Sequence, residues 1–133
     1  ENITERLSLY QQLDEFAREE ELEAFAAELE DRFGPIPQPV NDLFTVVRCR
    51  WLAVTLGFEK IILKEESARC YFIANPDSPY FESPTFRHIM QFIQKAVHNA
   101  RLKQVGKNFM LVIDHIGSMQ QLESFFKAMH AGI

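Results

Sequence analysis

The 133-residue sequence has few of the features that mark disulfide-bonded, secreted or membrane-spanning proteins. Its two cysteines, Cys49 and Cys70, are fewer than the roughly four or more that a disulfide scaffold of this size uses. No stretch reaches the ~20 apolar residues of a membrane span, and no basic-then-apolar leader opens the chain. We therefore expect a cytoplasmic protein that keeps buried, reduced thiols and makes no membrane contact.

The motifs of metal sites and of nucleotide-driven catalysis are also missing. Only five glycines occur, and they form no phosphate-binding loop, no Gly-x-Gly-x-x-Gly fingerprint and no Gly-x-Ser-x-Gly elbow. No Cys-x-x-Cys occurs, and no two of the histidines are four residues apart; these are His88, His98, His115 and His130. Ser118, which follows Asp114-His115, is better explained as a helix N-cap than as a nucleophile. We expect no catalytic residue, no metal and no cofactor. If the chain belongs to a nucleotide-driven machine, we expect the motor in another part of that machine.

Charge is distributed unevenly along this chain, whose overall net charge is −5. Residues 1–34 hold eleven acids and three bases, a net charge of −8, and the remaining 99 residues have a net charge of +3. Hydrophobic residues make up 47%, which is typical of a folded chain, and we expect one compact domain over residues 1–133. Because the first residue is Glu1 and not Met, we also expect a processed, trimmed or excised chain.

Apolar residues at helical spacing predict three helices in the first half of the chain. The first starts at an N-cap on Asn2 and ends near Arg18, and the second runs from Glu19 to the stop at Gly34-Pro35. The third starts at Pro37, ends at Gly57 and is apolar on two sides, so we expect it to be the central helix. The apolar stripe of the second helix consists of Leu22, Phe25, Ala26, Leu29 and Phe33. The main stripe of the third consists of Val40, Leu43, Phe44, Val47, Trp51 and Val54.

The pattern changes after the third helix and predicts two strand pairs with a helix after each. The expected strands are 59–64, 69–74, 101–105 and 108–114, with the continuously apolar stretch 109–113 marking an interior strand. A fourth helix starts at Ser83-Pro84, with Val97 on its inner face, and a capping box at Ser118 starts the last helix. The predicted fold class is α+β: N-terminal helices packed with a small, mostly antiparallel four-stranded sheet and two further helices.

A cluster of acids near the end of the second helix is the strongest candidate for an interaction surface. At about 100° per residue, Glu28 and Asp31 lie together on the side away from the apolar stripe, and Glu21 points the same way. Asp31 is in the last helical turn, where the helix dipole disfavours an anion. One interpretation is a solvated face that keeps the protein soluble, with Glu28 paired to Arg32 at i,i+4 spacing. The other is a surface that binds the arginines of a partner.

Two further interpretations stay open. Arg101, Lys103 and Lys107 gather around the second hairpin, where they form either a solvated sheet face or a weak nucleic-acid-binding site. The chain could also be a small enzyme or ligand sensor, which a bound ligand or a deep pocket that gathers Asp114 and His115 would favour.

Three stretches of the sequence resemble a known family. They are Leu9-Tyr10-x-x-Leu13, Glu28-Leu29-x-Asp31-Arg32-Phe33-Gly34-Pro35-x-Pro37, and Leu56-Gly57-Phe58-x-Lys60-Ile61. Together they are similar to the C-terminal domain of the bacterial transcription-repair coupling factors, the Mfd or TRCF family. The resemblance covers residues about 5 to 62, and the rest agrees in the order of its elements.

The resemblance implies that this chain is the C-terminal regulatory domain of a larger ATP-dependent DNA translocase that acts in nucleotide excision repair. Such a parent removes RNA polymerase stalled at DNA lesions and recruits repair proteins through an amino-terminal module similar to UvrB. The C-terminal domain lacks the motor and masks the UvrA-binding surface of that module, acting as an autoinhibitory latch. Matched onto this sequence, Glu28 and Asp31 face arginines of the masked module, with Glu21 and Arg32 beside them.

Overall fold

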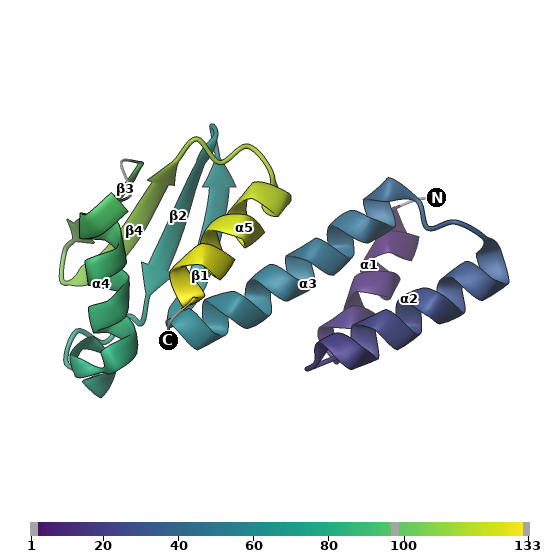
Figure 1. The fold of residues 1–133 in the computed structure, drawn as a ribbon, viewed down its shortest axis with the longest axis horizontal. Helices are drawn as coiled ribbons and strands as arrows, with labels where there is room; N and C mark the ends of the chain where they lie inside the picture. The colour runs from purple at the N-terminus through teal and green to yellow at the C-terminus, as the bar shows by residue number, and fades with distance from the viewer. Residues whose placement is uncertain (1–2, 97–98, 132–133) are drawn as a thin grey trace. The chain divides into compact units, whose positions relative to one another are not determined.

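The computed structural model describes residues 3–96 and 99–131, with side chains described for 7–95 and 99–131. The predictions made for Asn2, Val97 and His98 lie outside these residues. The helices are α1 (Ile3–Asp14), α2 (Glu19–Phe33), α3 (Gln38–Leu56), α4 (Pro84–Ala96) and α5 (Met119–His130), with a 3-10 turn η1 (Pro79–Glu82) (Figure 1). The strands are β1 (Phe58–Lys64), β2 (Ser67–Phe72), β3 (Ala100–Val105) and β4 (Asn108–Asp114).

The chain divides into two compact units, Glu1–Trp51 and Leu52–Ile133, and α3 contributes residues to both. The prediction of one domain over residues 1–133 stays a prediction.

The first unit is a three-helix cluster. Leu13, Leu22, Phe44 and Val47 form its buried core, each no more than 3% exposed. The Trp51 indole N–H donates to the Phe16 carbonyl at 3.2 Å, which holds α3 to the chain segment that follows α1. These contacts bury most of the apolar stripes whose spacing predicted the helices.

The first helix is shorter than predicted, because it ends at Asp14 and not near Arg18. Arg50 of α3 pairs with the Asp14 carboxylate and donates to the Asp14 carbonyl at 3.3 Å. The residues directly after Asp14 are not helical, and Arg18 adopts an extended conformation as the N-cap of α2. The chain therefore uses the residues between Asp14 and Glu19 as a connection that starts a new helix.

The third helix also differs from its predicted pattern. Val54 was expected to be in the apolar stripe but is 70% exposed. By Val54 the helix has passed the core of the three-helix cluster, and the buried positions there are Ala53 and Leu56. Periodicity predicted which side of α3 is apolar, but not where along the helix the covering elements stop.

The second unit contains one antiparallel sheet of strand order β1-β2-β4-β3, so the predicted interior position of β4 is confirmed. A turn of only two residues, Glu65 and Glu66, joins β1 to β2, and both residues have positive φ angles of 55° and 58°. The predicted turn was longer because Ser67 and Ala68, which belong to β2, were included in it. A two-residue turn of this hand matches the twist of the paired strands.

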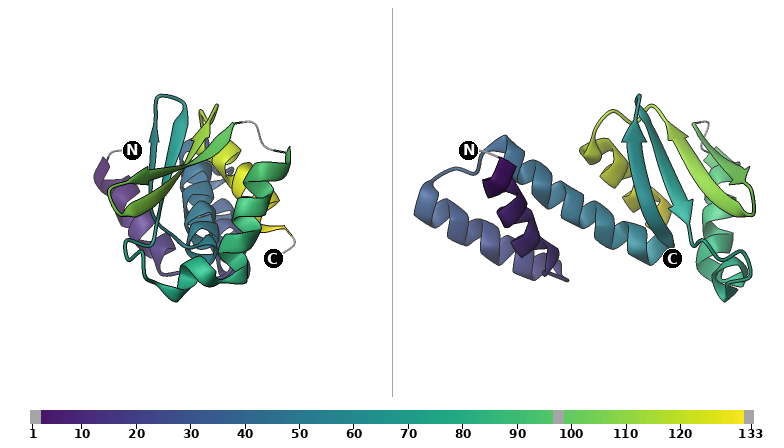
Figure 2. Two further views of the ribbon diagram at one scale, coloured as in Figure 1. Left: turned by 90° about the vertical axis from the view of Figure 1, so that its left-hand side faces the viewer. Right: turned by 180° about the vertical axis from the view of Figure 1, so that it is seen from behind.

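α4 and α5 lie on one face of the sheet, as the views in Figures 1 and 2 agree. Phe126 of α5 stacks on Phe58 with ring centroids 5.6 Å apart. Phe86 of α4 meets Phe72 edge-to-face at 5.3 Å. The Ser118 hydroxyl accepts from the Gln121 N–H at 3.2 Å, which confirms the predicted cap of α5. The predicted α+β class and the four-stranded antiparallel sheet are thus confirmed.

The junction between α3 and β1 is closed by a tyrosine. Gly57 has a φ angle of 98°, and a Cβ atom there would overlap the ring of Tyr80. The Tyr80 hydroxyl donates to the Leu56 carbonyl, and burial raises the pKa of the phenol. Glycine is required at this position both by the backbone angle and by the close approach of the ring.

Among the described residues, none of the helices combines the length and apolarity needed to cross a lipid bilayer.

Candidate interface on the second helix

Two of the acids at the start of α2, Glu21 and Glu19, are engaged within the chain. The Glu21 carboxylate accepts from the backbone N–H groups of Ala17 at 2.7 Å and Arg18 at 3.1 Å. These hydrogen bonds lower the pKa of Glu21, and the one from Ala17 has the largest effect. Glu21 is therefore the N3 carboxylate that satisfies free donors at the helix start. The sequence placed it on the same side as Glu28, but its contacts give it a structural role in starting α2.

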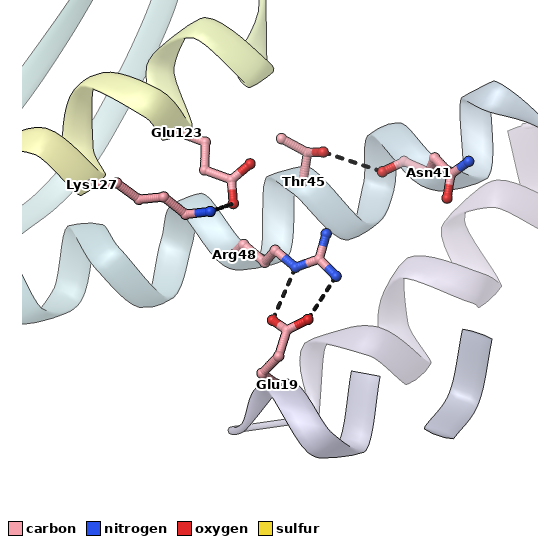
Figure 3. A network of polar contacts seen from close by, with 6 residues as sticks. All are labelled: Glu19, Asn41, Thr45, Arg48, Glu123 and Lys127. Atoms are coloured by element: carbon pink, nitrogen blue, oxygen red, sulfur yellow. Dashed lines mark hydrogen bonds and ion pairs between the residues drawn. The ribbon is translucent and has the colours of Figure 1, made fainter. Parts of the chain in front are cut away.

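Glu19 has a similar internal role. Its two carboxylate oxygens accept from Arg48 of α3 at 3.0 and 2.8 Å, in the paired geometry shown in Figure 3. Both side chains are partly exposed, at 44% for Glu19 and 31% for Arg48. This bidentate pair fixes the first turn of α2 to α3, so part of the acidity of the first unit serves its own packing.

Glu28 and Asp31 lie farther along α2 and are exposed. The Glu28 carboxylate is 3.7 Å from an Arg32 guanidinium nitrogen, and the two side chains are 61% and 64% exposed. An exposed pair of this length contributes little to stability, about 0.2–0.5 kcal/mol. Within the described part of the chain, Asp31 makes no hydrogen bond or ion pair. The predicted exposed positions of Glu28 and Asp31 are therefore confirmed, with at most weak engagement by the chain itself.

The local field does not favour acids at this end of the helix. α2 ends at Phe33, and the Gly34 N–H donates to the Glu30 carbonyl at 2.9 Å as the helix closes. Asp31 lies in this last turn, close to the negative end of the helix dipole. Glu28 is one turn before it on the same side and repels it. The pair thus presents two carboxylates, at some cost in stability, to whatever cation approaches from outside.

Phe33, the last residue of α2, was expected to be buried, but it is 72% exposed. It falls on the apolar side of the helix, but the chain turns away at Gly34-Pro35 before a neighbouring element can cover it. A groove of about 250 Å³ lies beside it. The groove is lined by Leu9, Leu29, Phe33, Gly34, Pro35, Ile36, Pro37 and Val40. Phe33 is about 160° around the helix from Asp31, so the groove and the acid pair face different directions.

The basic hairpin occupies the edge of the sheet, because β3 is the last strand in the order. Arg101, Lys103 and Lys107 are all exposed. The Arg101 guanidinium pairs with the Asp114 carboxylate of the neighbouring strand at 2.6 Å. One alternative predicted for this hairpin was a solvated sheet face. The three bases are indeed exposed, but Arg101 is paired with an acid of the same sheet.

The pairing of Asp114 also bears on the enzyme alternative. With its carboxylate held by Arg101, Asp114 does not orient His115, which is exposed and has a positive φ angle of 65°. In the part of the chain that the structure describes, no three His, Cys, Asp or Glu side chains gather closely enough to hold a metal ion.

Comparison with known proteins gives consistent matches to one group. The profile of the family described as the TRCF domain matches residues 1–83. The transcription-repair-coupling factor of Escherichia coli (strain K12) is 38% identical over 60 residues, which is 45% of this chain and 5% of that protein. That of Rickettsia bellii (strain RML369-C) is 26% identical over 102 residues, which is 77% of this chain and 8% of that protein. This chain therefore spans only 5–8% of the length of these relatives.

A solved structure has the same fold. It is described as the crystal structure of the C-terminal domain of transcription-repair coupling factor, and it superposes with a TM-score of 0.71 over 96% of this chain and 80% of that chain. Sequence identity between the two is 14%, so this likeness concerns the fold. The family match reaches residue 83 and so extends past the three helices into the β1–β2 hairpin and η1, beyond the residues on which the resemblance was recognised.

Proposed function

Because the chain belongs to the TRCF domain family, we propose that it is the non-catalytic, autoinhibitory C-terminal domain of a transcription-repair coupling factor. In this proposal the exposed end of α2, with Glu28 and Asp31, covers the UvrA-binding surface of a UvrB-like module in the same protein. The motor that moves along DNA and acts on stalled RNA polymerase belongs to other parts of the parent protein.

The mechanism is a competition between two partners for one surface. Arginines of the UvrB-like module would pair with the carboxylates of Glu28 and Asp31, because a guanidinium can bind both oxygens of a carboxylate at once. A tethered domain has an effective concentration on the order of millimolar, so a weak polar interface is enough to keep the surface covered. A weak polar interface also opens readily, as a latch must.

The observation that carries this proposal is the contrast between the two ends of α2. Acids at its start serve the fold, through the cap made by Glu21 and the bidentate pair made by Glu19. At its end, Asp31 is exposed and placed against the helix dipole, and among the described residues Glu28 makes only the long contact with Arg32. A carboxylate that gives the fold nothing and is easily reached is well suited to bind a cation on a partner.

Arg32 and Glu21 have different places in the proposal. Arg32 lies beside the acid pair at 3.7 Å from Glu28, and it would have to release that contact when a partner arginine binds. Its guanidinium also lies 5.4 Å from the centre of the Phe33 ring, which gives it an alternative resting place. Glu21 is occupied by the helix cap, so we leave it out of the proposed contacts.

The test is a double charge reversal, Glu28→Lys with Asp31→Lys, in the full-length parent protein. UvrA capture by the immobilised parent is measured with and without the reversal. The unmodified protein should bind UvrA poorly, and the reversed protein should bind it at least about tenfold better, since two charge-assisted contacts of about 1.5 kcal/mol or more each are lost.

The matched control is Glu20→Lys with Glu23→Lys, which makes the same change in charge on exposed positions of the first half of α2. This control should leave UvrA capture unchanged. The assignment of Glu28 and Asp31 is wrong if UvrA binding stays masked after their reversal, or if the control releases it equally.

A further inference from the structure

The face of the sheet opposite α4 and α5 carries a set of basic residues that the sequence did not bring together. Residues paired across an antiparallel ladder lie on the same face, so the register identifies its rows. One row contains Ile62, Arg69, Val112 and Arg101, from β1, β2, β4 and β3 in that order. The next row contains Lys60, Tyr71, Met110 and Lys103. Cys70 and Phe72 alternate with Arg69 and Tyr71 along β2 and so lie on the opposite face, where Phe72 contacts α4.

The charge of this face is predominantly positive. Lys60, Lys64 and Lys103 are exposed, and Arg69 is half-buried. The acids that this register places lie at one end, where Asp114 shares a row with Ser67 and Lys64 and where the turn Glu65-Glu66 follows. Glu59, at the bulge of β1, accepts from the Ala74 N–H. Asp114 pairs with Arg101. Within the part of the chain that the structure describes, the basic side chains of this face that no acid holds are Lys60, Lys64, Arg69 and Lys103. They occupy β1, β2 and β3, so a ligand that meets them all has to cross the strands.

An aromatic ring lies among these bases. Tyr71 is half-buried in the second row, and the Lys60 ammonium group is 5.2 Å from the centre of its ring. Met110 and Val112, each 5% exposed, form the floor between the basic side chains. The combination is a sheet face with cations on β1, β2 and β3 and one aromatic ring on the interior strand β2.

We propose that this sheet face binds single-stranded nucleic acid. Cationic side chains contact the phosphates, and Tyr71 offers a face on which a base can stack, the pairing of features that single-strand-binding surfaces use. A duplex fits less well, because its bases are stacked inside and its major groove admits a helix or a two-stranded ribbon, whereas this face is four strands wide. The proposal does not depend on the proposed function of α2.

The expected strength follows from the number of cations. Four phosphate contacts on a single strand give a slope of about −2.8 for the logarithm of the binding constant against the logarithm of salt concentration. Affinity should therefore fall about 50-fold between 50 and 200 mM salt. The unit Glu1–Trp51 holds twelve acids against five bases, a net charge of −7, which opposes polyanions at long range and keeps the binding weak.

The test measures fluorescence anisotropy of labelled 12-nucleotide strands, dT12 and rU12, with the complete 133-residue chain at 50 to 200 mM NaCl. We expect saturable binding with a dissociation constant on the order of 10⁻⁵ M at 50 mM salt. The DNA and RNA arms distinguish the two kinds of strand, and saturable binding of either supports the proposal. A 12-base-pair duplex is the third arm and should bind at least about fivefold more weakly.

Variants separate a built surface from general charge. Lys60→Glu with Lys103→Glu should weaken binding about tenfold or more and lower the slope to about −1.4. The control, Arg87→Glu with Lys95→Glu, makes the same charge change on exposed positions of α4, on the other side of the sheet, and should change affinity less than threefold. Tyr71→Ala should weaken binding about tenfold, and Tyr71→Phe should retain it.

Three results would overturn the proposal. The first is that neither dT12 nor rU12 binds saturably at 50 mM salt. The second is that the double substitution on the sheet and the control on α4 lower the affinity equally. The third is that the duplex binds as tightly as the single strands. Circular dichroism of every variant shows whether a loss reflects the site or the fold.

Discussion

Replacing Asp31 by Asn should make this protein more stable, although we propose that Asp31 binds the partner. The carboxylate lies in the last turn of α2, is exposed and has no partner in the described part of the chain. Asn keeps nearly the same size and helix propensity but removes the negative charge. The substitution therefore isolates the electrostatic effect of the carboxylate on the fold.

Two contributions determine the size of the effect. An exposed acid at the negative end of a helix dipole costs about 0.3–1 kcal/mol. Its repulsion with Glu28, three residues before it, costs about 0.2–0.5 kcal/mol. Asp31→Asn should raise the free energy of unfolding by about 0.5–1.5 kcal/mol, which for a chain of this length corresponds to a melting temperature about 2–5 °C higher.

Two variants on the same helix provide the comparison. Glu20→Gln removes an exposed acid from the first turn, where the dipole favours it, and should destabilise by about 0.3–1 kcal/mol. Glu28→Gln removes the repulsion with Asp31 but also the long pair with Arg32, so its effect should be close to zero. Urea unfolding at 20 mM and 500 mM NaCl measures all three, and high salt should shrink every difference.

The reasoning fails if Asp31→Asn destabilises the chain, because the carboxylate would then serve the fold as Glu19 and Glu21 do. It fails equally if Glu20→Gln and Asp31→Asn shift stability in the same direction. Position along the dipole would then not govern the energetics of acids on α2.

Three further predictions concern the fold. Gly57→Ala should cost about 3–5 kcal/mol in urea unfolding because of its backbone angle and the overlap with the phenol ring, whereas Gly106→Ala, with φ of 64° and open space around it, should cost about 1–2 kcal/mol. Phe33→Ser should cost less than about 0.5 kcal/mol, in contrast to Leu22→Ala at about 2–5 kcal/mol, since only the second side chain is buried. Glu21→Gln should lower the free energy of unfolding at neutral pH. The difference from the unmodified chain should disappear as the pH falls below 4.5, the usual pKa of this group, because the carboxylate stabilises the fold only while it is charged.

Most of the fold could be predicted because its elements are amphipathic and clearly bounded. The strand β4 was predicted with the bounds that the structure has, since its continuous apolar run and the flanking Gly106-Lys107 and Asp114 leave no other choice. The two errors in predicted burial share one physical cause. Phe33 and Val54 lie on the apolar sides of their helices, but burial also requires another element that packs against that part of the helix. Hydrophobic periodicity contains no information about where such packing elements end.

The candidate sites show the same limit at the level of single contacts. Helical phase placed Glu21, Glu28 and Asp31 on one side, but it could not reveal that backbone N–H groups hold Glu21. The position of Asp31 in the exposed last turn was predicted correctly, because it depends on one helix and its stop at Gly34-Pro35, which the sequence does supply.

The sheet face was missed for the opposite reason, because its members come from strands far apart in the chain. The sequence shows Arg101, Lys103 and Lys107 as a local hairpin cluster, and in that view aromatic residues do not interleave with them. The ladder instead places Lys103 in the row of Tyr71 and Lys60, about 30 and 40 residues earlier. Helix charge could thus be judged from neighbours in sequence, but the composition of a sheet face depends on register. An acidic helix end that is read locally and a basic face that is assembled only by folding therefore need separate tests.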